Sequence, residues 1–106
     1  MARTLLNLPK TAQRGEVIEI RSLIAHPMDS GFQIDSLGRT VPRNILKRFT
    51  CRYNGEQVFS AEMFPAMSAN PYLVFYTVAT ESGTLEFEWQ GDNGFTQTER
   101  VAITVT

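Results

Sequence analysis

The sequence predicts a single all-β domain, and three observations support this prediction. Apolar and polar residues alternate with a period of two in several short segments, which is typical of strands that place one face on a core. Turn residues separate these segments, and no long segment keeps the 3.6-residue period of a helix. With 106 residues the chain can build one two-layer core but no second domain. We therefore expect an immunoglobulin-like antiparallel β-sandwich of six or seven strands spanning residues 1–106, with residues 1–14 as an extended N-terminal segment.

The first two strands are expected at residues 16–25 and 45–53. The isoleucines of the first segment share one face, whereas Val17 and Leu23 lie on the other face, so this strand is expected to be covered on both sides. The second segment directs Cys51 and its aromatic neighbours inward and its basic residues outward.

A hairpin is expected directly after the second strand, at Asn54-Gly55. An Asn-Gly pair between two alternating segments is a strong hairpin signal, because both central residues of a type I′ turn need a positive φ. The partner strand is expected at residues 56–62, and residues 63–71 are expected to connect the two sheets.

The last three strands are expected at residues 72–79, 84–90 and 95–105. The first of these is apolar on both faces, with Tyr and Val at the even positions, whereas the second alternates cleanly between inward apolar residues and outward glutamates. Turns containing Gly separate these strands, at residues 81–83 and 91–94.

The segment between the first two strands, residues 26–44, shows no periodicity. Loops of this length are uncommon in compact domains and tend to be functional or disordered. Two interpretations stay open: a hairpin excursion with Phe32 and Ile34 packed back on the sandwich, or a partner-binding element. In a partner-binding element, the cations of this region would steer acidic proteins or anions towards the loop. The candidate docking residues are His26, Met28, Arg39 and Arg43.

Catalytic, cofactor and metal sites are not expected. A Ser-His-Asp arrangement would have to use His26, the only imidazole, which precedes Pro27 and is restricted to an extended conformation. Two ligands, His26 and Met28, are too few for a metal site. A hydrogen bond from the loop backbone to His26 is the expected alternative. Cys51, the single cysteine, faces inward and is expected to be structural. No glycine-rich phosphate loop is present. We therefore expect a protein that is not an enzyme.

The composition excludes two classes of partner. Ten Lys and Arg against eleven Asp and Glu give a net charge of -1, whereas a nucleic-acid surface needs clustered cations. No apolar segment approaches the roughly 20 residues that span a bilayer. Asn7 and Pro9 interrupt the leucines near the N-terminus, so no export signal is expected in the chain itself.

One group of apolar residues exceeds what a sandwich core needs. A sandwich strand requires one apolar face, yet residues 72–79 have two, and methionine and aromatic residues lie close by in sequence. Such a group is typical of an obligate interface, and the alternative is that it covers the open end of the domain's own core. The candidate interface residues are Met63, Phe64, Met67, Tyr72, Val74, Tyr76 and Val78.

Six short runs of residues carry a resemblance that covers nearly the whole chain. They are residues 24–28 (IAHPM), 42–45 (PRNI), 48–51 (RFTC), 53–55 (YNG), 69–72 (ANPY) and 79–85 (ATESGTL). In order and spacing, from about Gly15 to Thr106, they resemble the SoxZ family, a subunit of the bacterial sulfur-oxidising (Sox) system.

The resemblance implies a non-catalytic subunit without a cofactor. SoxZ-like proteins form an obligate heterodimer with SoxY, whose flexible tail carries a Cys that holds sulfur intermediates from thiosulfate while other Sox enzymes dock and act on them. This chain ends in a strand pattern without such a tail, and Cys51 lies in mid-strand. The resemblance also implies a periplasmic protein, exported while bound to its signal-bearing partner.

The alternative function is a free-standing immunoglobulin-like module that binds a small ligand or a metal through His26 and Met28. Behaviour in solution separates the two hypotheses: a heterodimer subunit self-associates or is poorly soluble alone, whereas a free-standing module is a well-behaved monomer.

Overall fold

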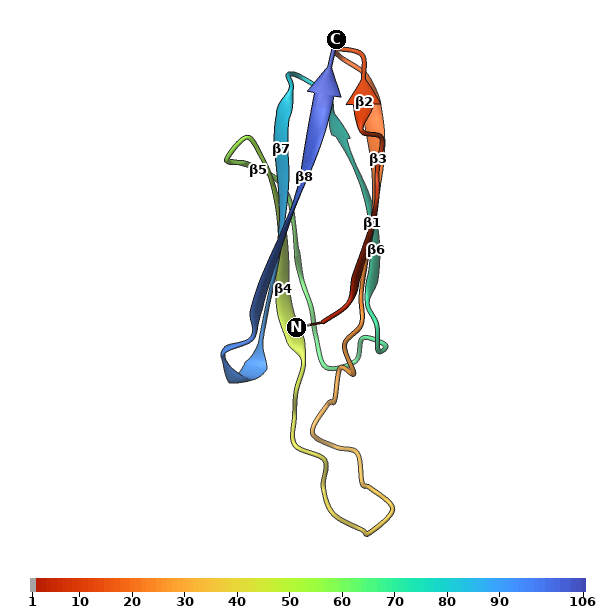
Figure 1. Cartoon of the computed structure of the whole chain (residues 1–106). Helices are drawn as coiled ribbons and strands as arrows, with labels where there is room; N and C mark the ends of the chain where they lie inside the picture. The colour runs from red at the N-terminus through yellow and green to blue at the C-terminus, as the bar shows by residue number, and fades with distance from the viewer. Residues whose placement is uncertain (1) are drawn as a thin grey trace.

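The computed structural model describes residues 2–106, whose eight strands form two sheets packed face to face (Figure 1). The smaller sheet has the order β1-β3-β6, and the larger has the order β2-β8-β7-β4-β5. This confirms the predicted immunoglobulin-like sandwich. The strands are β1 (Thr4–Asn7), β2 (Thr11–Ala12), β3 (Val17–Ile24), β4 (Leu46–Tyr53), β5 (Glu56–Glu62), β6 (Tyr72–Val78), β7 (Gly83–Gly91) and β8 (Thr96–Val105), with a 3₁₀ turn, η1 (Asp92–Gly94), before the last.

The N-terminal segment differs from the prediction. It is extended, but it pairs with both sheets: β1 pairs antiparallel with β3, and β2 pairs parallel with β8. The chain therefore crosses from the smaller to the larger sheet between these two strands. Because β1 has four residues and β2 only two, neither shows an alternation long enough to detect, and the structure has eight strands instead of the six or seven expected.

Aromatic rings from both sheets meet in the core. Phe49 on β4 lies at the centre, with its ring centroid between 5.2 and 6.3 Å from those of Phe59, Phe75, Phe87 and Trp89. Phe59 on β5 stacks on Phe75 on β6, with centroids 4.2 Å apart, and so joins the two sheets along one side. The inward faces predicted for β4 and β7 are confirmed.

The predicted hairpin turn is also confirmed. Asn54 and Gly55 have φ angles of 50° and 84°, as a type I′ turn requires. The Asn54 side chain accepts a hydrogen bond of 2.9 Å from the backbone N–H of Thr84, which fastens the hairpin to β7. No helix in residues 2–106 is long and apolar enough to cross a membrane.

Residues 26–44 project from one end of the sandwich as an irregular hairpin (Figure 1). Two isolated bridges, Asp29 with Asn44 and Ile34 with Thr40, hold its two halves together. The expectation that Phe32 and Ile34 pack back on the sandwich is wrong, because Phe32 is 88% exposed and Ile34 is exposed as well. The hairpin extends beyond the end of the core, so its tip has no apolar surface to cover.

Candidate partner interface

Four of the candidate interface residues lie together on the outer face of the smaller sheet. Side chains alternate along β6, so Phe75 points into the core while the residues at even positions point to solvent. Each of these even residues is at least two-fifths exposed: Tyr72, Val74, Tyr76 and Val78. They therefore do not cover the open end of the domain's own core.

The neighbouring strand β3 extends this face. In the antiparallel register Val17 lies opposite Val78, and Leu23 lies opposite Tyr72. Val17 is 63% exposed, so the expectation that β3 is covered on both sides does not hold in the chain alone. On the far side of β3, the exposed side chain of Leu5 on β1 lies opposite Leu23.

An ion pair lies in the middle of this apolar face. Glu19 and Arg21 on β3 join through a contact of 2.5 Å between Nε of Arg21 and Oε1 of Glu19. The hydroxyl of Tyr76 donates a hydrogen bond of 2.9 Å to Oε2 of the same carboxylate. The bonds from Arg21 and then Tyr76 lower the pKa of Glu19, and the bond to Glu19 raises the pKa of Tyr76. Both charges therefore have partners within the face.

Three residues of this face, namely Leu5, Val17 and Leu23, are not among the interface residues predicted from the sequence. Val17 and Leu23 had a signal, since their strand is apolar on both sides. Leu5 had none, because only the pairing of β1 with β3 brings it beside Leu23. We name the set Leu5, Val17, Leu23, Tyr72, Val74, Tyr76 and Val78 the apolar face.

The remaining candidate interface residues lie in the connection between β5 and β6, and they differ in how far they are buried. Met63 is only 4% exposed, so its assignment to a surface is wrong. It continues the inward alternation of Phe59 and Ala61, and its N–H donates to the carbonyl of Lys47 at 2.9 Å. Met67 is half-buried against the core, and Phe64 is exposed.

Two of the candidate docking residues, His26 and Met28, are buried at the base of the hairpin loop. Nδ1 of His26 accepts a hydrogen bond of 3.1 Å from the N–H of Met28, as expected for a histidine that binds loop backbone. Sδ of Met28 accepts from the N–H of Leu46 at 3.2 Å. Burial lowers the pKa of His26, which packs edge-on against Phe95. Their assignment to a docking surface is therefore wrong, since the packing of the loop base encloses both.

These contacts also bear on the metal-binding alternative. Nδ1 of His26 and Sδ of Met28 each accept a backbone N–H, so both atoms are engaged in holding the loop. Within residues 2–106, no group of three or more His, Cys, Asp and Glu side chains is placed to hold a metal ion.

The other two docking candidates, Arg39 and Arg43, each bind a carboxylate. Arg39 forms an exposed pair with Asp35 at 3.1 Å, and Oδ1 of Asp35 also accepts the N–H groups of Leu37 and Arg39, which shapes the tip of the loop. Arg43 forms a two-pronged pair with Asp92 in the turn between β7 and β8, at 2.8 and 3.1 Å. The loop is therefore less positive than its sequence indicates.

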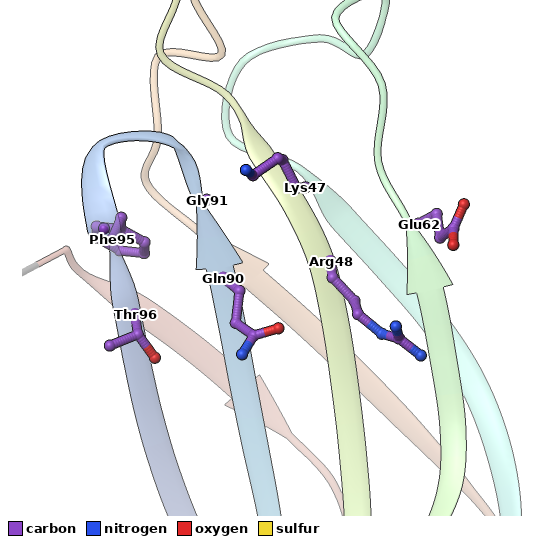
Figure 2. A pocket seen from close by; sticks show the side chains of 8 residues that line it. Lys47, Arg48, Glu62, Gln90, Gly91, Phe95 and Thr96 are labelled. Atoms are coloured by element: carbon purple, nitrogen blue, oxygen red, sulfur yellow. The ribbon is translucent and has the colours of Figure 1, made fainter.

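Two further cations line an open pocket on the outer face of the larger sheet (Figure 2). Lys47 and Arg48 on β4 lie between Gln90 on β7 and Glu62 at the end of β5. Nζ of Lys47 also lies 3.8 Å from Oδ1 of Asp92. The pocket lies on the side of the sandwich opposite to the apolar face.

Cys51 is fully buried on β4, as predicted for a structural cysteine. Burial raises the pKa of its thiol to about 12. The reactive thiolate is therefore scarce at neutral pH.

Together these features define an immunoglobulin-like sandwich whose main exposed feature is an apolar sheet face. Comparison of the sequence with protein families then identifies it more closely. The model of the family described as sulphur oxidation protein SoxZ matches residues 6–102, so the chain belongs to the SoxZ family. This membership gives the chain a role in the Sox system of sulfur oxidation. A comparison with curated proteins gives no match.

Solved structures with the same fold include a Sox protein. The sulfur carrier protein SoxY from Chlorobium limicola f. thiosulfatophilum matches with a TM-score of 0.67 and 14% identity, over 97% of this chain and 79% of that one. The superoxide reductase (neelaredoxin) from Ignicoccus hospitalis matches with a TM-score of 0.74 and 13% identity, over 99% and 82%. A putative superoxide reductase from Thermotoga maritima matches with a TM-score of 0.73 and 13% identity, over 97% and 85%. At these identities the likeness shows the fold alone.

Proposed function

We propose that the chain is the non-catalytic scaffold subunit of a heterodimeric sulfur carrier in thiosulfate oxidation. Its partner is a SoxY-like subunit that holds the sulfur intermediate on a C-terminal Cys, and the pair forms an obligate complex in the periplasm, exported through the partner's signal. The observation that carries this proposal is the apolar face on a member of the SoxZ family.

The chemistry of the apolar face supports an obligate interface. Such interfaces bury more than about 2,000 Å² in total and are richer in apolar and aromatic residues than the rest of the surface. A charge buried without a partner would oppose association. On this face Glu19 is already bound by Arg21 and Tyr76, so the ion pair can be covered without leaving an unpaired charge.

Copurification with a SoxY-like subunit tests the proposal. Val74→Asp and Tyr76→Asp each place a carboxylate on the apolar face and should abolish the heterodimer while the circular dichroism spectrum stays unchanged. Ala102→Asp is the matched control, because Ala102 is exposed on β8, in the other sheet. If both face variants still copurify with the partner as Ala102→Asp does, the apolar face is not the interface.

The hairpin loop at residues 26–44 is proposed as a docking element for the enzymes that act on the carrier. Loops held by a rigid scaffold are common sites of recognition. The exposed tip residues Phe32, Ile34 and Leu37 support this role better than the four residues selected from the sequence. Of those four, only Arg39 lies at the tip.

A further inference from the structure

Among the strands of residues 2–106, β6 is an edge strand without the usual protection against pairing. Native edge strands are short, charged, bulged or interrupted by Pro. At the other edges β1 and β2 are short, and β5 carries Glu at both ends and a register shift opposite Cys51 and Arg52. In contrast, β6 has seven residues without a charge, Pro or Gly, and its register with β3 is unbroken.

The hydrogen bonds at the two ends of β6 show which backbone groups face its free edge. The carbonyl of Pro71 accepts from the N–H of Ile24, and the N–H of Ala79 donates to the carbonyl of Glu16, so residues 71 and 79 both face β3. In an antiparallel ladder this orientation alternates from residue to residue. The odd residues of β6 therefore bond to β3, and the even residues direct their N–H and C=O groups to the free edge.

The even residues are also the β6 members of the apolar face. Tyr72, Val74, Tyr76 and Val78 thus present unpaired backbone groups at the edge and apolar side chains beside it. A strand added at this edge would form ladder hydrogen bonds with the unpaired backbone groups. Its side chains would cover part of the apolar side chains through cross-strand contacts.

We propose that β6 pairs with an edge strand of the carrier subunit, so that one continuous sheet crosses the heterodimer. The identity of the partner rests on the function proposed above. The carrier is the occupant because a SoxY structure shares this two-sheet fold over 97% of the chain, so it too has sheet edges with which β6 can pair. The edge is also continuous with the apolar face, which is the proposed interface.

Amide hydrogen exchange, measured by NMR on the free chain and on the heterodimer, tests the pairing directly. In the free chain the amides of residues 73, 75 and 77 should exchange slowly and those of 72, 74, 76 and 78 quickly. In the heterodimer the second set should slow by about tenfold or more, because each amide gains a ladder bond. Unchanged exchange of the even amides in an intact heterodimer would overturn the edge pairing and leave the proposed function standing.

A proline substitution provides the second measurement. Val74→Pro removes an outward N–H without touching the ladder to β3, so the thermal transition should persist while affinity for the carrier falls by about tenfold to 100-fold. Val74→Ala is the matched control, because it shortens the side chain but keeps the N–H. Equal affinities of the two variants would contradict the proposal.

Two further outcomes concern the occupant. The even amides could become protected as the concentration of the free chain rises, to the same extent with or without the carrier. This result would assign the edge to a second copy of the chain and contradict the proposal. Failure of the wild-type chain to bind the carrier at all would overturn the proposed function together with the pairing.

Discussion

Arg43 binds Asp92 through two hydrogen bonds, of 2.8 and 3.1 Å, and so ties the end of the hairpin loop to the turn between β7 and β8. The same carboxylate accepts the N–H of Ile45 at 3.1 Å. Asp92 therefore holds two points of the chain just before β4 begins. The two arginines of this loop consequently have different roles: Arg43 fixes the base of the loop, and Arg39 belongs to its tip.

The first prediction follows from this anchor. Arg43→Ser should lower the melting temperature, whereas Arg39→Ser, at an exposed pair, should leave it nearly unchanged. Thermal unfolding followed by circular dichroism compares the two variants. Equal melting temperatures of both variants and the wild type would show that the Arg43 pair is dispensable for folding.

The second prediction concerns the pH dependence of the same pair. The hydrogen bond from Arg43, followed by that from the Ile45 N–H, lowers the pKa of Asp92 to about 2, below its unfolded value of about 4. A carboxylate whose pKa is lower in the folded state than in the unfolded state stabilises the fold. This stabilisation is fully present above the unfolded-state pKa and is lost as the pH falls through the folded-state pKa. The difference in melting temperature between wild type and Asp92→Asn should therefore be full at pH 6 and shrink between about pH 4 and pH 2. A difference that stays constant over this range would contradict the prediction.

The third prediction tests the tip of the hairpin loop. Phe32→Ser combined with Leu37→Ser should leave the melting temperature and the heterodimer unchanged, because both side chains are exposed. Turnover of the reconstituted Sox system should slow through a higher KM for the carrier. Thr40→Ser, in the same loop, is the control.

The salt dependence of KM separates the contribution of the apolar tip residues to docking from that of the charged residue Arg39. The effect of the Phe32 and Leu37 substitutions should persist at high ionic strength, whereas any effect of Arg39→Ser should fade because exposed charges are screened. Unchanged KM values for the double variant at every salt concentration would remove the docking role from the tip.

The fourth prediction is that Cys51 is structural. Cys51→Ala should cost about 1–2 kcal/mol of stability, the low end for loss of a small buried group, and sulfur-oxidising turnover should persist. Because burial raises the pKa of the thiol to about 12, a thiol reagent should react with the native protein only as it unfolds. Rapid titration of the native thiol, or a disulfide between Cys51 and the partner found by mass spectrometry, would contradict this.

The fifth prediction separates the neighbours Met63 and Phe64. Met63 lies in the core, so Met63→Ala should lower the free energy of unfolding by about 2–4 kcal/mol. Phe64 is exposed, so Phe64→Ala should change it by no more than about 0.5 kcal/mol. Urea unfolding of both variants measures the difference. Similar losses for the two would mean that Phe64 is also part of the packed core.

The sequence by itself determined the features that depend on neighbouring residues along one strand. Alternation placed Cys51 inside and set Val74 and Tyr76 together on one face of their strand, and Asn54-Gly55 specified its turn through the φ angles it favours. These features follow from the two-residue period of a strand and from backbone sterics, which are local.

Only the tertiary structure decided which distant residues meet. Leu5 joins the apolar face through the register of β1 with β3, and His26 and Met28 are buried because the base of the loop packs under Phe95 and β4. Arg43, expected to have a free charge, forms an ion pair with Asp92, which is 49 residues away in sequence. Pairing across sheets depends on burial and geometry that no local pattern encodes, and this is the physical reason why the fold was predictable while much of the candidate site was not.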